Sequence, residues 1–575
     1  MGMMSLHVFW NNLRRSLVLL LVAVTAALAA YAGEAREDFS SKPWALREHY
    51  VFSFDSNTAR FLYGSDNAEW TIEFEGIGKF VDKARASLTL ATGQEIFLDE
   101  FDKGNARRER FTTEVGAGNH FSADLPERDG IKVRHQVSVH NSYPFLIIRM
   151  HVTNTGEEPF GIKKLSPAIF GPGCLKNVSG HMESVIRRVD MRAGYAAFDR
   201  NANSSLAFFH DPQHLRTIGL GVLPLNIARS GINLEPFGGS WQGEIASEFD
   251  PPIVLAPGES LSADPVFITF SVPKPEEVET YFTWTRSNLP RPNMPDDTPR
   301  FWCTVEEGAS ADALYAAAER WGRAGVRHAL VPGAWESRPG SLEGARPRYP
   351  KNMQAVASTI EGMRMTPGLT VDPLAAIEGG PSYAAAMGGQ TWLNLAHPEG
   401  YAQAVANMRQ VAGWGFQFFV VQKSLIPDEV LRAFNMTRTQ ADALALEAMA
   451  DAAPGLPVFP SSATTLRDNL DDWLEAAGCT SRLWEYRIAS GPVRFDTSGI
   501  STLSEDVAMV MTFFGGPIEL LGLPHRDLAS QIRLIERRLA QPIDVLQRAP
   551  KMWLVAEDGS ESGNRTLITF PRTSS

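Results

Sequence analysis

Short runs in which apolar and polar residues alternate fill residues 48–286. Two of them are Ile131-Lys-Val-Arg-His-Gln-Val-Ser-Val139 and Phe145-Leu-Ile-Ile-Arg-Met-His-Val152, and turn residues such as Asn154-Thr-Gly156 separate the runs. Alternation with a period of two places one face of a strand against a core and leaves the other face polar. The pattern therefore predicts a large antiparallel β-sandwich over residues 48–286.

Segment 287–299 contains four prolines in thirteen residues. Proline fixes φ and removes a backbone donor, so a segment this rich in proline favours neither a helix nor a strand. We therefore expect a linker that separates the sandwich from the rest of the chain.

After residue 300, apolar runs alternate with helical patterns. Phe416–Val421 is almost entirely apolar, as expected for a parallel strand that is covered on both faces. Seven strand–helix units can be counted, and they predict a (β/α)8 TIM-type barrel over 300–545, followed by a short C-terminal β hairpin over 546–575. A doubly wound sheet is the alternative, although no G-x-G-x-x-G turn opens any unit. Further predicted elements are the strands Phe301–Val305, Val326–Val331 and Thr366–Val371, a helix from about Ser310 and a helix over 401–412.

The first 32 residues have the pattern of a secretory signal peptide. Arg14 and Arg15 precede the apolar run 16–30, and Ala30-Tyr31-Ala32 matches the A-x-A cleavage pattern. The run is short for a spanning helix, which needs about 20 apolar residues. We therefore predict an exported protein, periplasmic or extracellular, with no membrane span after cleavage. An uncleaved N-terminal anchor is the alternative.

Charge and cysteine content narrow the possible partners. The formal net charge is −12 and the pI is near 5.6, which argues against nucleic acid as a partner. The chain has three cysteines and twelve histidines, without C-x-x-C, H-E-x-x-H or H-x-H spacing, so neither a metal site nor a cofactor is predicted. Nothing in the sequence predicts an oligomeric state.

Five segments of the predicted barrel carry a recognisable series of motifs. They are Phe301-Trp-Cys-Thr304, Val331-Pro-Gly-Ala-Trp335, Thr366-Pro-Gly-Leu-Thr-Val371, Trp414-Gly-Phe-Gln-Phe-Phe-Val-Val-Gln422 and Arg487-Ile-Ala-Ser-Gly491. In this order they resemble the motifs W-C-S/T-W, hydrophobic-D-D-G-W, K-P-G-L-W, W-G-F-D-x-x-K-x-D and R-I-x-x-D of the α-galactosidase and raffinose-synthase-like retaining glycoside hydrolases. The resemblance covers about residues 300–570 and implies α-linked glycans as the substrate class.

The resemblance also implies where catalytic carboxylates belong. A retaining glycosidase needs a nucleophile and an acid/base about 5 Å apart. The motifs place the nucleophile at position 422 and the acid/base at position 491, where this chain has Gln422 and Gly491. The two aspartates of the second motif are replaced by Pro332 and Gly333, and the lysine of the fourth by Val420. Catalysis by the family's route should therefore be impaired.

Other residues offer partial substitutes. Asp372 and Glu336 follow neighbouring predicted strands and could form a relocated carboxylate pair, although ordinary loop charges are the simpler interpretation, as they are for Glu306 and Glu307. The candidate sugar contacts are Trp302, Trp335 and Arg487. We therefore predict a divergent α-galactosidase-like glycoside hydrolase that acts on or recognises α-linked glycans. The alternative is a secreted carbohydrate-binding protein, without catalysis, on the same fold.

Overall fold

The structure is a computed structural model that describes residues 47–569 with internal gaps. The gaps are 55–56, 65–67, 75–77, 103–104, 114–115, 141–144, 176–205, 212–215, 223–226, 238–239, 270–298, 300, 424, 462–464, 467–492, 499, 501, 504–517, 540–543, 550–551 and 557–564. The predicted signal peptide, nearly all of the linker, Arg487 and Gly491 lie outside the described residues.

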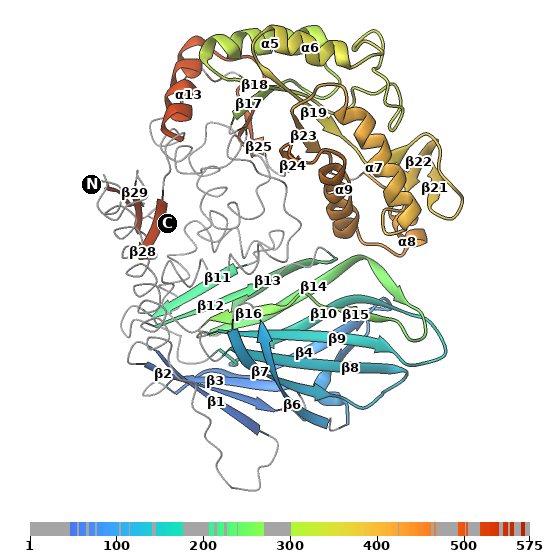
Figure 1. Ribbon diagram of the computed structural model, residues 1–575. Helices are drawn as coiled ribbons and strands as arrows, with labels where there is room; N and C mark the ends of the chain where they lie inside the picture. The colour runs from blue at the N-terminus through green and yellow to red at the C-terminus, as the bar shows by residue number, and fades with distance from the viewer. Residues whose placement is uncertain are drawn as a thin grey trace, which may run out of the picture.

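The N-terminal part is an antiparallel sandwich of two sheets (Figure 1). One sheet has the order β1-β2-β3-β4-β10-β14-β13, with β5 on β4, and the other has the order β11-β12-β16-β9-β8-β7-β6, with β15 on β9. The first sheet comprises β1 (Arg47–Phe54), β2 (Asn57–Gly64), β3 (Glu69–Phe74), β4 (Gly78–Leu90), β5 (Glu95–Phe97), β10 (Phe160–Phe170), β13 (Arg229–Phe237) and β14 (Ser240–Leu255). The second comprises β6 (Asn105–Thr113), β7 (Gly116–Asp124), β8 (Ile131–His140), β9 (Phe145–Asn154), β11 (Leu206–Asp211), β12 (Arg216–Val222), β15 (Ser260–Ser262) and β16 (Val266–Thr269).

The predicted alternation is visible in β8. Val133, Val137 and Val139 are fully buried in the sandwich core, and Lys132 is exposed. His135 shares the buried face and bonds Tyr63, with 2.9 Å between Tyr63 Oη and His135 Nδ1. Burial of a polar side chain is tolerated when it is hydrogen-bonded, and this pair meets that condition.

The C-terminal part is built on eight parallel strands in the order β24-β23-β19-β18-β17-β27-β26-β25. The first strand, β17, pairs with the last, β27, as a barrel requires. No pairing of β24 with β25 is found among the described residues, so the closed barrel stays a prediction and the structure shows a curled parallel sheet. Its strands are β17 (Phe301–Thr304), β18 (His328–Val331), β19 (Thr366–Val371), β23 (Phe418–Val421), β24 (Val458–Pro460), β25 (Thr465–Leu466), β26 (Val493–Asp496) and β27 (Ile518–Leu521).

Helices cover the outer face of this sheet (Figure 1). They are α5 (Ala311–Ala324), α6 (Gln354–Gly362), α7 (Pro398–Ala412), α8 (Asp428–Phe434), α9 (Arg438–Ala452) and α13 (Arg526–Leu539). Helix α5 begins where the sequence predicts, because Ser310 Oγ accepts the Ala313 N–H, and it ends at Gly325 with φ 102°. Within the described ranges, no helix is long and apolar enough to cross a membrane.

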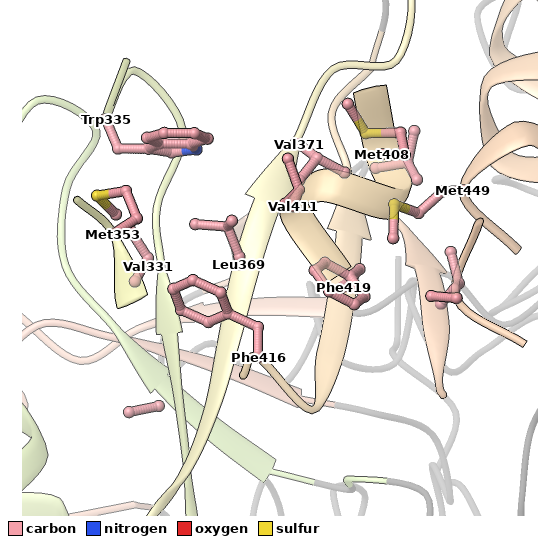
Figure 2. Packing of buried hydrophobic residues seen from close by; sticks show 14 of the residues in the cluster. Val331, Trp335, Met353, Leu369, Val371, Met408, Val411, Phe416, Phe419 and Met449 are labelled. Carbon is pink, nitrogen blue, oxygen red and sulfur yellow. The ribbon is translucent and has the colours of Figure 1, made fainter. Parts of the chain in front are cut away.

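Alternate residues of the parallel strands point to opposite faces of the sheet and belong to two different hydrophobic clusters. Outward-facing side chains pack against the helices, as Figure 2 shows for Val331, Leu369, Val371 and Phe419 with Met408, Val411 and Met449. The inner face holds a separate cluster of Trp302, Leu330, Phe418, Val420 and Phe459. The side chains just beyond the carboxyl ends of the strands therefore converge at one end of the curled sheet. We call this end the mouth.

Two smaller sheets depart from the sequence prediction. An Ala-rich stretch between β19 and α7 forms a three-stranded sheet that was not predicted, made of β20 (Ala375–Ala376), β21 (Ala384–Met387) and β22 (Gln390–Leu393). The predicted C-terminal hairpin is also a three-stranded sheet, because β28 (Asp544–Ala549) joins β29 (Met552–Ala556) and β30 (Arg565–Thr569).

The two parts contact each other through the residues that follow α8. The Asn435 side chain accepts the Val254 N–H at 2.8 Å and donates to the Val254 carbonyl at 2.7 Å. Thr437 Oγ1 donates to the Ile227 carbonyl. These bonds fix the parallel sheet against the edge of the sandwich.

Candidate functional site

The carboxyl ends of four adjacent strands bring polar groups to the mouth. Glu307 follows β17, Gly333 follows β18, Asp372 follows β19 and Gln422 follows β23. The Gln422 N–H donates to the Val371 carbonyl at 2.8 Å, which places Gln422 beside Asp372 on the neighbouring strand.

Gly333 leaves a space between two side-chain oxygens. A Cβ at this position would lie 3.2 Å from Gln422 Oε1 and 3.4 Å from Glu307 Oε1. The next residue, Ala334, has φ 58°, in the left-handed region that favours glycine. The second motif has its glycine at this position, so the backbone follows the motif although the side chains differ.

The two side chains at this space have hydrogen-bonding capacity to spare. Gln422 is half-buried and Glu307 is exposed. Within the described part of the chain, neither side chain makes a hydrogen bond to another residue. An amide offers donors and an acceptor, and a carboxylate offers acceptors only, so together they suit a polyhydroxylated ligand.

Asp372 is held at the strand end by its own turn. Its Oδ1 accepts the Leu374 N–H at 3.0 Å, and the side chain is half-buried. Burial raises its pKa to about 7; the charges of Glu336 and Asp442 add to this, and the Leu374 and Ala375 amides oppose it. Asp372 can therefore exchange a proton near neutral pH.

Both carboxylate oxygens of Glu336 accept hydrogen bonds from backbone amides of its own loop. Oε2 accepts the Gly340 N–H at 3.0 Å, and Oε1 accepts the Leu342 N–H at 2.9 Å. Burial raises the pKa of Glu336, and these two amides oppose that shift. Its charge also raises the pKa of Asp372, so the two carboxyl groups interact through space. Glu336 organises the loop, and its role there accounts for its burial.

Replacing Glu336 with glutamine is expected to lower the free energy of unfolding by about 1–2 kcal/mol, because one loop amide then faces an NH2 group instead of an acceptor. Urea unfolding followed by fluorescence measures this. Glu343→Gln is the matched control, since Glu343 pairs with Lys351 at the surface and its loss should cost less than about 0.5 kcal/mol. Equal unfolding midpoints for the two variants would contradict the role given to Glu336.

The two tryptophans predicted as sugar contacts are enclosed. Trp335 is 3% exposed, its Nε1 donates to the Thr370 carbonyl at 2.7 Å, and its ring meets Trp414 edge to face (Figure 2 shows its place). Trp302 is fully buried in the inner cluster, with ring centroids 5.4 Å from Phe418 and 5.0 Å from Phe459. This burial fits packing below the mouth, and neither ring presents a free face to a sugar.

An ion pair on the inner face was missed in the sequence analysis. Glu519 is 2% exposed, and its Oε1 accepts from Nε and Nη2 of Arg494 at 3.2 and 3.1 Å. Burial raises the pKa of Glu519, Arg494 lowers it, and the charge of Glu307 raises it again. Glu519 is the only charged residue in the apolar run Ile518–Leu521, and that was the available signal.

No group of three or more His, Cys, Asp or Glu side chains suited to a metal ion occurs among the described residues. The described ends of β17, β18, β19 and β23 bring Glu307, Gly333, Asp372 and Gln422 to the mouth.

Comparisons with known proteins establish the fold. No family model matches the chain, and no curated protein matches it in sequence. Among solved structures, a variant of the GH36 α-galactosidase AgaA from Geobacillus stearothermophilus, in complex with 1-deoxygalactonojirimycin, superposes with a TM-score of 0.52 at 10% identity, over 89% of each chain. Another variant of AgaA, in complex with raffinose, gives 0.51 at 10% identity, again over 89% of each chain. The α-N-acetylgalactosaminidase NagBb from Bifidobacterium bifidum, in complex with GalNAc, gives 0.52 at 13% identity, over 90% of this chain and 100% of that one. The chain therefore has the multidomain fold of these glycoside hydrolases.

Proposed function

We propose that the mouth of the parallel sheet binds α-linked glycans and does not hydrolyse them by the two-carboxylate route of retaining glycosidases. The observation that carries this is Gln422 at the carboxyl end of β23, the position of the nucleophile in the motif resemblance. A neutral amide is a poor nucleophile and carries no charge to stabilise an oxocarbenium ion. What remains at the mouth is suited to hydrogen-bonding hydroxyls.

The fold supports the choice of ligand class. Structures of similar fold hold 1-deoxygalactonojirimycin, raffinose and GalNAc. Sites on folds of this type lie at the carboxyl ends of the strands, where Glu307, Asp372 and Gln422 lie here. Because a shared fold alone does not fix function, the proposal depends on these side chains.

We also propose that the protein is exported, because residues 1–32 have the pattern of a secretory signal peptide. The glycans that it binds would then lie outside the cytoplasm.

A hydrolase with a relocated carboxylate is the second candidate. It is favoured by Asp372, a half-buried strand-end carboxyl whose pKa is raised to about 7, as a general acid at neutral pH requires. Glu336, the partner predicted from the sequence, has both oxygens bound to loop amides. The second candidate would therefore need another carboxylate as its base or nucleophile.

The test combines calorimetry with hydrolysis assays on the purified mature protein. Methyl α-galactoside, raffinose and GalNAc are titrated, and a panel of p-nitrophenyl α- and β-glycosides is incubated with the wild type, Gln422→Asp and Asp372→Asn. We expect saturable binding of at least one sugar and no turnover by the wild type. Turnover that disappears in Asp372→Asn would replace the proposal with the second candidate. Absence of both binding and turnover would overturn both.

A further inference from the structure

We propose that Glu307 is a sugar-binding residue which, together with Gln422, holds two neighbouring hydroxyls of a neutral sugar in the space beside Gly333. This rests on the proposed function and names the group that anchors the ligand. In the sequence, Glu307 is one of two consecutive glutamates and is indistinguishable from an ordinary loop charge.

The geometry brings an oxygen from each of two separate strand ends to one point. Gln422 Oε1 lies 3.2 Å, and Glu307 Oε1 lies 3.4 Å, from the position that a Cβ of residue 333 would take. The two oxygens are therefore no more than about 7 Å apart, and two neighbouring hydroxyls can span such a gap with hydrogen bonds of about 2.8 Å each. The glycine leaves this point free of protein atoms.

The chemistry of the two groups divides their roles. A carboxylate only accepts, so Glu307 would accept a charge-assisted hydrogen bond from one sugar hydroxyl. The Gln422 amide can donate to the second hydroxyl or accept from it. Neither side chain is hydrogen-bonded to another described residue, so ligand binding would break no bond within the described structure.

The carboxylates near the strand ends favour a neutral sugar over an acidic one. On the described parallel strands the one Lys or Arg side chain is Arg494, and it is already paired with the buried Glu519. The influence of Glu307 on the pKa of Glu519 shows that these two carboxylates lie within electrostatic range of each other. A sugar carboxylate placed beside Glu307 would meet like charge. Of the cations next to these strand ends, Arg348 donates to the Gly308 carbonyl at 3.1 Å and Lys423 is exposed to solvent.

The experiment measures affinity by calorimetry with the full mature chain. The probes are methyl α-galactoside, raffinose and methyl α-galacturonide. The variants are Glu307→Gln, Gly333→Ala and, as the matched control, Glu306→Gln, which removes the same charge from the same loop. Melting temperatures accompany each titration.

We expect Glu307→Gln to weaken binding of the neutral probes by about 10-fold, the effect of losing one charge-assisted hydrogen bond. Glu306→Gln should stay within about twofold of the wild type, as removal of a rim charge does when no contact is lost. Gly333→Ala should weaken binding by at least as much as Glu307→Gln, at an unchanged melting temperature, because the new methyl group meets only the ends of two flexible side chains. The galacturonide should bind the wild type more weakly than the galactoside, and Glu307→Gln should narrow that difference.

The titrations distinguish failure of this inference from failure of the proposed function. Wild-type affinity for the neutral probes in both Glu307→Gln and Gly333→Ala would overturn this inference and leave the proposed function standing. Equal losses in Glu306→Gln and Glu307→Gln would overturn it too, since they would indicate general charge and not contact. A wild type that binds none of the probes would overturn the proposed function, and the inference with it.

Discussion

Replacing Arg494 with methionine is expected to lower the free energy of unfolding by about 3–5 kcal/mol at neutral pH, because it leaves a buried carboxylate without its partner. Glu519 is 2% exposed on the inner face, and Arg494 is the cation bonded to it. Methionine keeps much of the arginine's apolar volume, so the change removes charge more than packing. Urea unfolding of the two proteins measures the loss.

The same variant should show a distinctive pH dependence. Burial already raises the pKa of Glu519 above that of the unfolded chain, and without Arg494 the pKa should rise further. A raised folded-state pKa stabilises the fold below the unfolded pKa, and this contribution is lost as pH rises through the folded-state pKa. The stability of Arg494→Met should therefore fall between pH 5 and pH 8 by more than that of the wild type.

A double variant separates charge from packing. Arg494→Met with Glu519→Met removes both charges, and it should recover most of the stability lost in the single variant, since replacing a buried pair by apolar residues is often neutral. Identical unfolding of wild type and Arg494→Met at pH 8 would show that the pair does not hold the inner face together.

Gly368→Ala is expected to be the second most damaging change. A Cβ at this position would lie 2.2 to 2.4 Å from three atoms of the Phe418 ring, which is fully buried between Trp302 and Phe459 on the inner face. Overpacking of a filled core costs about 1–3 kcal/mol, and the enclosure of this ring places the expected loss at the upper end. The unfolding midpoint in urea measures it.

Two further variants test the cause. Gly362→Ala is the matched control: its Cβ meets nothing within 4 Å at the end of α6, so it should stabilise the protein by up to about 1 kcal/mol through helix propensity. Gly368→Ala combined with Phe418→Leu should be less destabilised than the sum of its two single changes. Strict additivity of the two changes would contradict the proposed clash.

Much of the fold could be predicted because its signal is local. The strand Thr366–Val371 and the start of α5 after Ser310 follow directly from an apolar run and a capping residue. The sheet β20-β22-β21 escaped prediction because alanine is a poor strand former and gives almost no alternation. Its strands form through pairing within the 375–393 stretch, which the local pattern does not reveal.

The candidate site was less predictable because its contacts join distant residues. A motif position located Gln422, and the end of a predicted strand located Asp372, where the structure places them. The approach of Glu307 to the space beside Gly333 depends on the conformation of a loop and on the absence of a side chain on another strand. The enclosure of Trp302 and Trp335 likewise depends on neighbours from other strands, so an aromatic residue in a motif could not be distinguished from a core residue.

The pairing of β17 with β27 has a consequence for how the chain is made. The two strands are separated by more than 200 positions, so β17 leaves the ribosome long before its partner exists. Until residue 518 has been synthesised, one edge of β17 carries unpaired backbone groups, which are prone to pair with other chains. Non-local pairing of this kind also slows folding, because a long loop must close first. A nascent or truncated chain that stops before β27 should therefore be the aggregation-prone form of this protein.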